Sequence, residues 1–195
     1  PPIWREKLDG DLVTGNSSGW PINARLSMGP SAFIGKIRDF IHADIRNGTI
    51  PLNKKQFFDL NYPLAEDSRN KQGNNDLHTE VSHAIYGFVI PGTRTYFVIG
   101  PSGGHKSGVI YKYARADGTL CPGDCSIDPS DYANYVWLWD VNDWDKVKHG
   151  KIRPTSIRPY YYGAFTIPIQ RSVSDNRLIG GTFDAKNNNI YLTID

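Results

Sequence analysis

The chain has 195 residues, 22 Lys+Arg against 20 Asp+Glu, a formal net charge of +2, and 39% hydrophobic residues. This composition excludes a disordered chain, because it provides enough apolar surface to bury a core. It has no basic run, which excludes the phosphate-tracking stripe of a nucleic-acid binder and a polybasic membrane patch. No run of about 18 apolar residues is present, so no membrane-spanning helix is expected. We expect a single domain over residues 1–195.

The first half of the chain shows weak patterns. Residues 1–30 are rich in turn-forming Gly and Pro, and little regular structure is expected there. Residues 31–40 contain a short apolar stretch that predicts a strand, and residues 41–47 predict a short helix ended by Gly48. Residues 66–76 carry charged and amide side chains with almost no apolar residue, which predicts a surface loop.

The second half has a much clearer strand pattern. Residues 84–90 and 95–100 are rich in β-branched and aromatic side chains, and the Pro-Gly turn between them predicts a hairpin. Further strands are predicted over 108–113, 135–140 and 160–165, and residues 178–183 are expected to pair with 190–193. Short antiparallel strands separated by frequent turns favour a sandwich, a barrel or a propeller.

An internal repeat favours the propeller. The segment IRNGTIP at 45–51 is echoed by VKHGKIRP at 147–154, 102 residues later, and each follows a predicted strand and short helix. Propeller blades are about 40 to 50 residues long, so this offset fits two blades. We therefore predict an all-β fold, a β-propeller or part of one, with about four blade-like antiparallel sheets and short helical turns. Because the chain opens on Pro1, we expect a fragment whose missing blades come from further chain or a partner copy.

Two cysteines lie close together in the sequence. Cys121 and Cys125 enclose three residues, a spacing that fits a disulfide loop or two ligands of a metal site. The disulfide is favoured because no further nearby ligands complete a zinc site, and it indicates a secreted or periplasmic protein. Two glycosylation sequons, at Asn16 and Asn47, fit secretion. The acidic run at 140–145 fits a helix N-cap better than calcium, so neither a metal nor a cofactor is expected.

Four segments carry a resemblance to known proteins: IYGFVIPGTRTYFVIG (85–100), GGHKSGVIYK (103–112), WLWDVND (137–143) and GGTFD (180–184). They resemble segments of uncharacterised secreted bacterial β-propellers over roughly residues 80–195. A weaker likeness is to propeller-fold polysaccharide lyases that cleave ulvan, a sulfated uronate polymer. Those enzymes use two His about twenty residues apart with Tyr and Arg from later blades. His83 and His105, 22 residues apart, are the matching pair here.

The segment from Gly100 to Ser107 has a Lys-Ser end that is typical of phosphate loops. That interpretation is rejected because β-forming residues follow it where such a loop needs a helix N-terminus. The remaining alternatives are a tight glycine-rich turn, or a loop that presents His105 and Lys106 to a substrate. His83 is likewise either a structural histidine or a catalytic one.

Aromatic residues supply further candidates. Arg158 and the three residues Tyr160, Tyr161 and Tyr162 form one short cluster. The cluster either packs or supplies a cation for a carboxylate or sulfate together with a tyrosine that stacks on a sugar or transfers a proton. Trp137 and Trp139 share one face of a predicted strand, and they form either core or a sugar platform.

Two hypotheses follow from these residues. The first is a secreted lyase that cleaves an anionic, uronate-containing polysaccharide by β-elimination. Arg158 would neutralise the carboxylate, His83 or His105 would act as base, and Tyr161 or Tyr162 as acid. The residues Trp137, Trp139, Tyr160 and Lys106 would bind the substrate. The second is a non-catalytic propeller module that binds carbohydrate or a protein partner. The lyase requires His83, His105, a Tyr and an Arg in one cleft.

Overall fold

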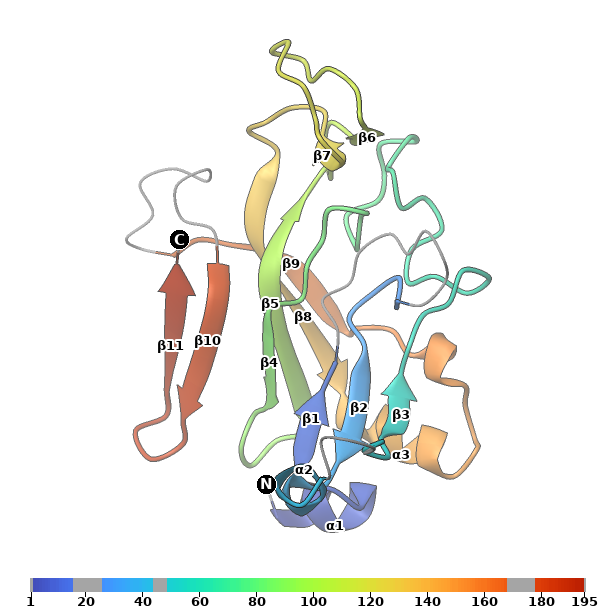
Figure 1. Cartoon of the computed structure of the whole chain (residues 1–195), viewed down its shortest axis with the longest axis vertical. Helices are drawn as coiled ribbons and strands as arrows, with labels where there is room; N and C mark the ends of the chain where they lie inside the picture. Colours follow the sequence, from blue (N-terminus) through green and yellow to red (C-terminus); the bar gives the residue numbers. More distant parts are fainter. Residues whose placement is uncertain (1, 16–25, 44–48, 168–177, 195) are drawn as a thin grey trace.

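The computed structural model describes residues 2–15, 26–43, 49–167 and 178–194. Within these ranges the chain is mostly β, with four antiparallel sheets connected by turns and short helices (Figure 1). The predicted all-β class is confirmed. The described strands form open sheets, and they do not close into a ring or barrel. The sequons at Asn16 and Asn47 and the predicted helix stop at Gly48 lie outside the described residues.

The largest sheet has the strand order β4-β5-β8-β9 and is called the central sheet below. Its strands are Tyr86–Val89, Thr95–Gly103, Tyr132–Asp140 and Tyr161–Phe165. All four were predicted, but β5 and β8 extend three residues further at one end. That extension contains Pro, Ser, Gly and Ala, which have weak strand propensity and are held by pairing, with Pro101 opposite Asn134.

A second sheet, β1-β2-β3, covers one face of the central sheet. It comprises Leu12–Thr14, Ala32–Gly35 and Asn53–Gln56, with helices α1 (Pro2–Leu8) and α2 (Ile37–Ile41) at its end. The predicted strand over 31–40 is wrong beyond Gly35, because the helix α2 begins at Ile37. Residues 1–30 also contain more regular structure than predicted, namely α1 and β1. The strand β3 has the sequence NKKQ, which contains no apolar pattern that would predict a strand.

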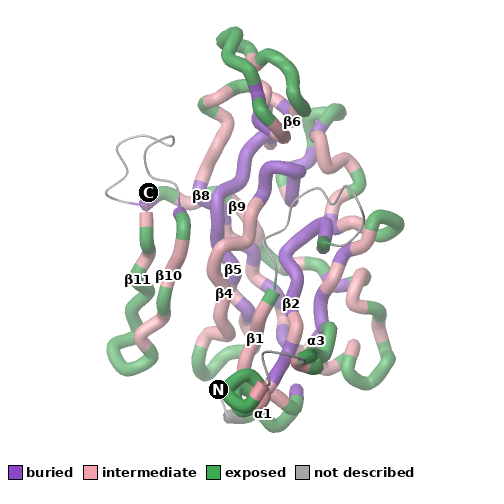
Figure 2. The backbone as a smooth tube through the Cα atoms, viewed as in Figure 1, coloured by how far each residue is buried: buried purple, intermediate pink, exposed green. Residues whose placement is uncertain are grey.

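The hairpin of β10 (Leu178–Asp184) and β11 (Asn189–Ile194) packs on the opposite face of the central sheet. The pairing confirms the predicted hairpin, and Phe183 of β10 stacks on Phe88 of β4 with ring centroids 4.5 Å apart. The described chain therefore forms three stacked layers of sheet, with the central sheet in the middle (Figure 1). Buried residues are concentrated in β5, in part of β8 and in β2, whereas the β10-β11 hairpin is mostly intermediate or exposed (Figure 2).

Alternation along the central strands produces this layering. In β8 the rings of Tyr135, Trp137 and Trp139 face the β1-β2-β3 sheet, where Trp137 and Trp139 are 0% exposed. Val136 faces the other way and packs in the smaller cluster with Ile99 and Leu178. A buried tryptophan contributes up to about 3 kcal/mol of hydrophobic stabilisation, so the first cluster is the main core.

The remaining elements extend the two ends of the central sheet. Helix α3 (Val141–Lys148) follows β8 directly, and the Asp140 carboxylate accepts the backbone N–H of Asn142, which confirms the predicted N-cap. The 3₁₀ helix η1 (Pro154–Ser156) precedes β9. At the other end β6 (Val109–Tyr111) pairs with β7 (Asp124–Ser126) in a separate small sheet, called the β6-β7 extension below (Figure 1).

The predicted surface loop at 66–76 is only partly correct, because two of its amides are buried. Asn75 is 8% exposed, its Nδ2 donates to the carbonyls of Asp67 and His78, and its Oδ1 accepts the N–H groups of Leu77 and His78. Asn70 is 3% exposed and donates to the carbonyls of Gly104 and His105. In this segment buried amide side chains, in place of apolar ones, hold the backbone by hydrogen bonds. The polarity of the sequence alone does not predict this role.

Candidate functional site

A pocket of about 410 Å³ lies between the central sheet and the β6-β7 extension. It is called the His83 pocket below. His83 enters from the loop before β4, Tyr132 and Asn134 come from β8, and Arg115 and Asp124 come from the extension. The site thus combines a titratable ring, a cation, a phenol, an amide and a carboxylate.

Three polar side chains of the His83 pocket have unused hydrogen-bonding capacity. Arg115 Nε, Asp124 Oδ1 and Asn134 Nδ2 are buried atoms with no hydrogen-bond partner among the described residues. Asn134 is itself 3% exposed. A buried polar group without a partner costs about 1 to 3 kcal/mol, so three around one pocket make it the candidate site.

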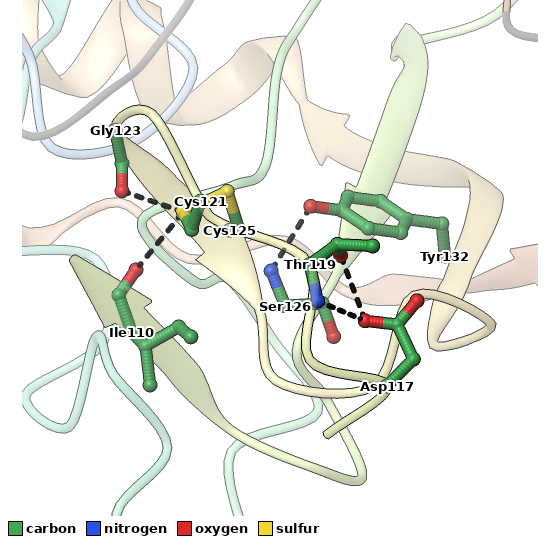
Figure 3. The surroundings of a disulfide bond; sticks show 8 residues. All are labelled: Ile110, Asp117, Thr119, Cys121, Gly123, Cys125, Ser126 and Tyr132. Atoms are coloured by element: carbon green, nitrogen blue, oxygen red, sulfur yellow. Dashed lines mark hydrogen bonds between the residues drawn. A yellow bond between two sulfur atoms is a disulfide. The ribbon is translucent and has the colours of Figure 1, made fainter. Parts of the chain in front are cut away.

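The pocket wall is held in place by a disulfide. Cys121 and Cys125 are bonded with an S–S distance of 2.00 Å, which confirms the predicted pairing, and Cys125 and Asp124 both line the pocket. Next to the disulfide, the Tyr132 hydroxyl accepts the backbone N–H of Ser126 at 3.0 Å (Figure 3). Because that bond uses a lone pair of the oxygen, the Tyr132 O–H proton remains available to donate.

His105 lies on the other face of the central sheet. Ser102 is opposite Ala133 in the ladder, on the face that carries Tyr135, and the His105 ring stacks on Tyr135 at 4.8 Å. A second pocket of about 520 Å³, with Ser102, His105 and Lys106 in its wall, lies there. The structure therefore does not bring His83 and His105 into one pocket, although Tyr132 lines both.

Both ring nitrogens of His105 are occupied by protein groups. Its Nδ1 lies 3.0 Å from the carbonyl oxygen of Asn75, and since a carbonyl only accepts, Nδ1 carries the proton. Its Nε2 therefore accepts from the Ser102 hydroxyl at 2.6 Å, and Ser102 in turn bonds Ser82 at 2.6 Å. Burial lowers the pKa of His105. The expectation that His105 acts as base loses its geometric support, because protein groups occupy both ring nitrogens.

His78 is close enough to His105 and His83 for both rings to affect its pKa. It is buried, and burial together with the nearby His105 and His83 rings lowers its pKa to about 3. His78 is therefore neutral at physiological pH and packs 6.1 Å from the Trp137 ring. Its role is structural.

The predicted cluster of Arg158 and three tyrosines lies away from the His83 pocket. Arg158 lines a different pocket, donates to the carbonyls of Thr155 and Ile157, and covers the Phe58 ring. Tyr160 is hydrogen-bonded to Thr95, and Tyr162 donates to the Asp76 carboxylate. Tyr161 is 55% exposed. None of the four lines the His83 pocket.

The two tryptophans proposed as a sugar platform belong to the core. Trp137 and Trp139 are each 0% exposed, so no ring face is open to a ligand, and Trp137 donates to the carbonyl of Leu77. The core alternative holds because both rings face the β1-β2-β3 sheet. Lys106 is exposed, and its backbone N–H donates to Asp131 at the rim of the second pocket.

Sequence reasoning missed Arg115, Asp124, Tyr132 and Asn134. Arg115 precedes the Asp-Gly turn at 117–118, and Asp124 lies inside the disulfide loop. The signal available was the cysteine pair, whose disulfide closes a short loop that contains Asp124. Asn134 lies one residue before the predicted strand at 135–140, in the part of β8 that was not predicted, so the strand pattern gave no signal for it.

The described residues contain no group of three or more His, Cys, Asp or Glu placed to hold a metal ion. No helix among them has both the length and the apolar character needed to span a membrane. The disulfide is typical of proteins from oxidising compartments. In comparisons with known proteins, no protein-family model, no curated protein and no solved structure matches the chain.

Proposed function

We propose that the chain binds an anionic, uronate-containing glycan in the His83 pocket and cleaves it by β-elimination. The observation that carries this proposal is the placement of His83, Arg115, Tyr132 and Asn134 around one pocket. The reaction is the β-elimination expected from the sequence, with two residues changed. Arg115 replaces Arg158 as the cation that neutralises the carboxylate, and Tyr132 replaces Tyr161 or Tyr162 as the acid.

Each of these side chains fits one requirement of the reaction. Arg115 and Asn134 donate to the uronate carboxylate, which disperses the negative charge that develops when the C5 proton leaves. His83 takes that proton, and the electron pair forms the C4–C5 double bond as the bond from C4 to the glycosidic oxygen breaks. Tyr132 donates its proton to the departing oxygen. No other reactant is needed.

The fold and the setting are proposed together with the activity. Antiparallel sheets that pack face to face on both sides of the central sheet are the feature that supports assignment to a β-propeller or part of one. The Cys121–Cys125 disulfide supports a secreted or periplasmic location, where polysaccharide is available outside the cell.

The test is the ultraviolet absorbance of the unsaturated uronate product, followed with unsulfated and sulfated uronate polysaccharides. Wild type is expected to form product, and His83→Ala and Tyr132→Phe are each expected to lower the rate by about 10²- to 10⁴-fold. His42→Ala, an exposed histidine remote from the pocket lining, is the matched control and is expected to keep full activity.

Two results would contradict the proposal in different ways. If wild type binds the polysaccharide but forms no product, the chain is the non-catalytic binding module, for which the separation of His83 from His105 is the favouring observation. If wild type forms product and His83→Ala is as active as wild type, the reaction takes place elsewhere on the molecule.

A further inference from the structure

The side chain of Asp124 is unexplained by the chemistry of the elimination. It lines the His83 pocket together with Arg115, and its Oδ1 is buried without a hydrogen-bond partner in the described part of the chain. Asp124 also acts on buried Glu80, whose pKa is raised mainly by burial and in part by the Asp124 charge. Glu80 is paired with Arg69 at 3.0 Å, so that arginine is already engaged by another carboxylate.

We propose that Asp124 determines substrate specificity by accepting a hydrogen bond from a free ring hydroxyl of the uronate bound to Arg115 and Asn134. This inference rests on the proposed function. It narrows the substrate class to uronates that are unsubstituted at the hydroxyl facing Asp124, and it excludes uronates that carry a sulfate ester at that position.

The exclusion follows from counting donors and acceptors. An ionised carboxylate only accepts hydrogen bonds, and a sulfate ester also only accepts, so the two have no proton to share. Two negative groups would also be held together in a partly buried site, where their repulsion is weakly screened. A free hydroxyl supplies the missing donor, and sites built around such a bond discriminate strongly against analogues that lack it.

The covalent structure of the extension keeps Asp124 at the pocket. Asp124 is the first residue of β7 and lies directly before Cys125, whose disulfide to Cys121 closes the loop. The backbone N–H of Lys112 donates to the carbonyl of Gly123 at 2.9 Å, which ties the same loop to the strand β6. A carboxylate held in this way loses little conformational entropy on binding, which favours a specificity role.

The test is calorimetric titration with an unsulfated disaccharide that has glucuronate at its non-reducing end, and with its O2- and O3-sulfated forms. These ligands have no glycosidic bond at C4 of the uronate, so they bind without being cleaved. Wild type is expected to bind the unsulfated form at least about 10-fold more tightly than one of the two sulfate esters. Asp124→Asn is expected to reduce this preference to within about 3-fold.

Asp117→Asn is the matched control. Asp117 is exposed on the same extension and does not line the pocket, and the substitution keeps the oxygen that accepts from Thr119 (Figure 3). It is expected to keep the wild-type preference, with unchanged near-ultraviolet circular dichroism in both variants. Equal binding of all three ligands by wild type, or an unchanged preference in Asp124→Asn, overturns the inference alone. Failure of wild type to bind any of the ligands overturns the proposed function as well.

Discussion

Gly100 gives a sharp test of how the central sheet positions the His83 pocket. A Cβ atom added at Gly100 would lie 1.8 Å from the carbonyl oxygen of His83 and 3.0 Å from the backbone nitrogen of Ile85. Backbone atoms are involved, so no side chain can rotate away to make room. Gly100→Ala must therefore displace the backbone at 83–85, which holds the His83 side chain at the pocket.

The size of the effect follows from the contacts of that segment. The N–H of His83 donates to the carbonyl of Pro101, and the N–H of Ile85 donates to that of Ile99, both at 2.9 Å. Losing both bonds costs about 1 kcal/mol each, and overpacking adds about 1 to 3 kcal/mol. We expect Gly100→Ala to lower the free energy of unfolding by about 3 to 5 kcal/mol.

Urea unfolding followed by tryptophan fluorescence measures this change, because Trp137, Trp139 and Trp144 are buried in the core. With a slope of about 2 kcal/mol per molar urea, the midpoint should fall by about 1.5 to 2.5 M. Gly163→Ala is the control in the same sheet, since the nearest atom to its Cβ is the Tyr161 hydroxyl oxygen at 3.9 Å. It should stay within about 0.5 kcal/mol of wild type. Equal midpoints for the two variants would refute the reasoning.

Two further predictions concern the buried polar residues Asn75 and His78. Asn75→Ala removes four hydrogen bonds to the backbone and should lower the free energy of unfolding by about 2 to 4 kcal/mol. Substitution of the exposed neighbour, Asn74→Ala, should have almost no effect. Similar urea midpoints for the two variants would contradict this prediction. His78 has a pKa lowered to about 3, so as the pH falls below about 6.5 the unfolded chain binds a proton that the folded chain does not. The free energy of unfolding should therefore fall by up to about 1.4 kcal/mol per pH unit, less steeply in His78→Gln, and parallel pH profiles for the two proteins would count against this role for His78.

The strands that were predicted well from sequence are those with runs of aromatic and β-branched residues. The central sheet and the β10-β11 hairpin are of this kind, and their aromatic and β-branched residues pack on both faces. Strand β3 was missed because its four polar residues, NKKQ, are paired at the edge of a sheet, where tertiary contacts override the local pattern. Asn75 was assigned to a surface loop because polarity does not show whether an amide faces water or backbone.

The candidate site was predicted only at His83 and the disulfide. Sequence spacing placed His83 and His105 as a pair, but a β-sheet separates residues onto two faces, and a spacing in sequence does not reveal which face each residue takes. Arg158 and the tyrosines at 160–162 were chosen because they cluster in sequence, whereas the pocket is built from segments 81–134. Arg115, Tyr132 and Asn134 are brought together by the β6-β7 extension folding back on β8, a long-range contact that sequence alone does not show.

The central claim is that the His83 pocket recognises a uronate through its carboxylate. The most direct measurement is calorimetric titration of wild type and Arg115→Gln with the uncleavable disaccharide that has glucuronate at its non-reducing end, and with the same disaccharide after its carboxyl group is reduced to an alcohol. The account predicts that wild type binds only the acid form and that Arg115→Gln binds it at least about 10-fold more weakly. Equal binding of the acid and reduced forms by wild type, or undiminished binding of the acid form by Arg115→Gln, would contradict it.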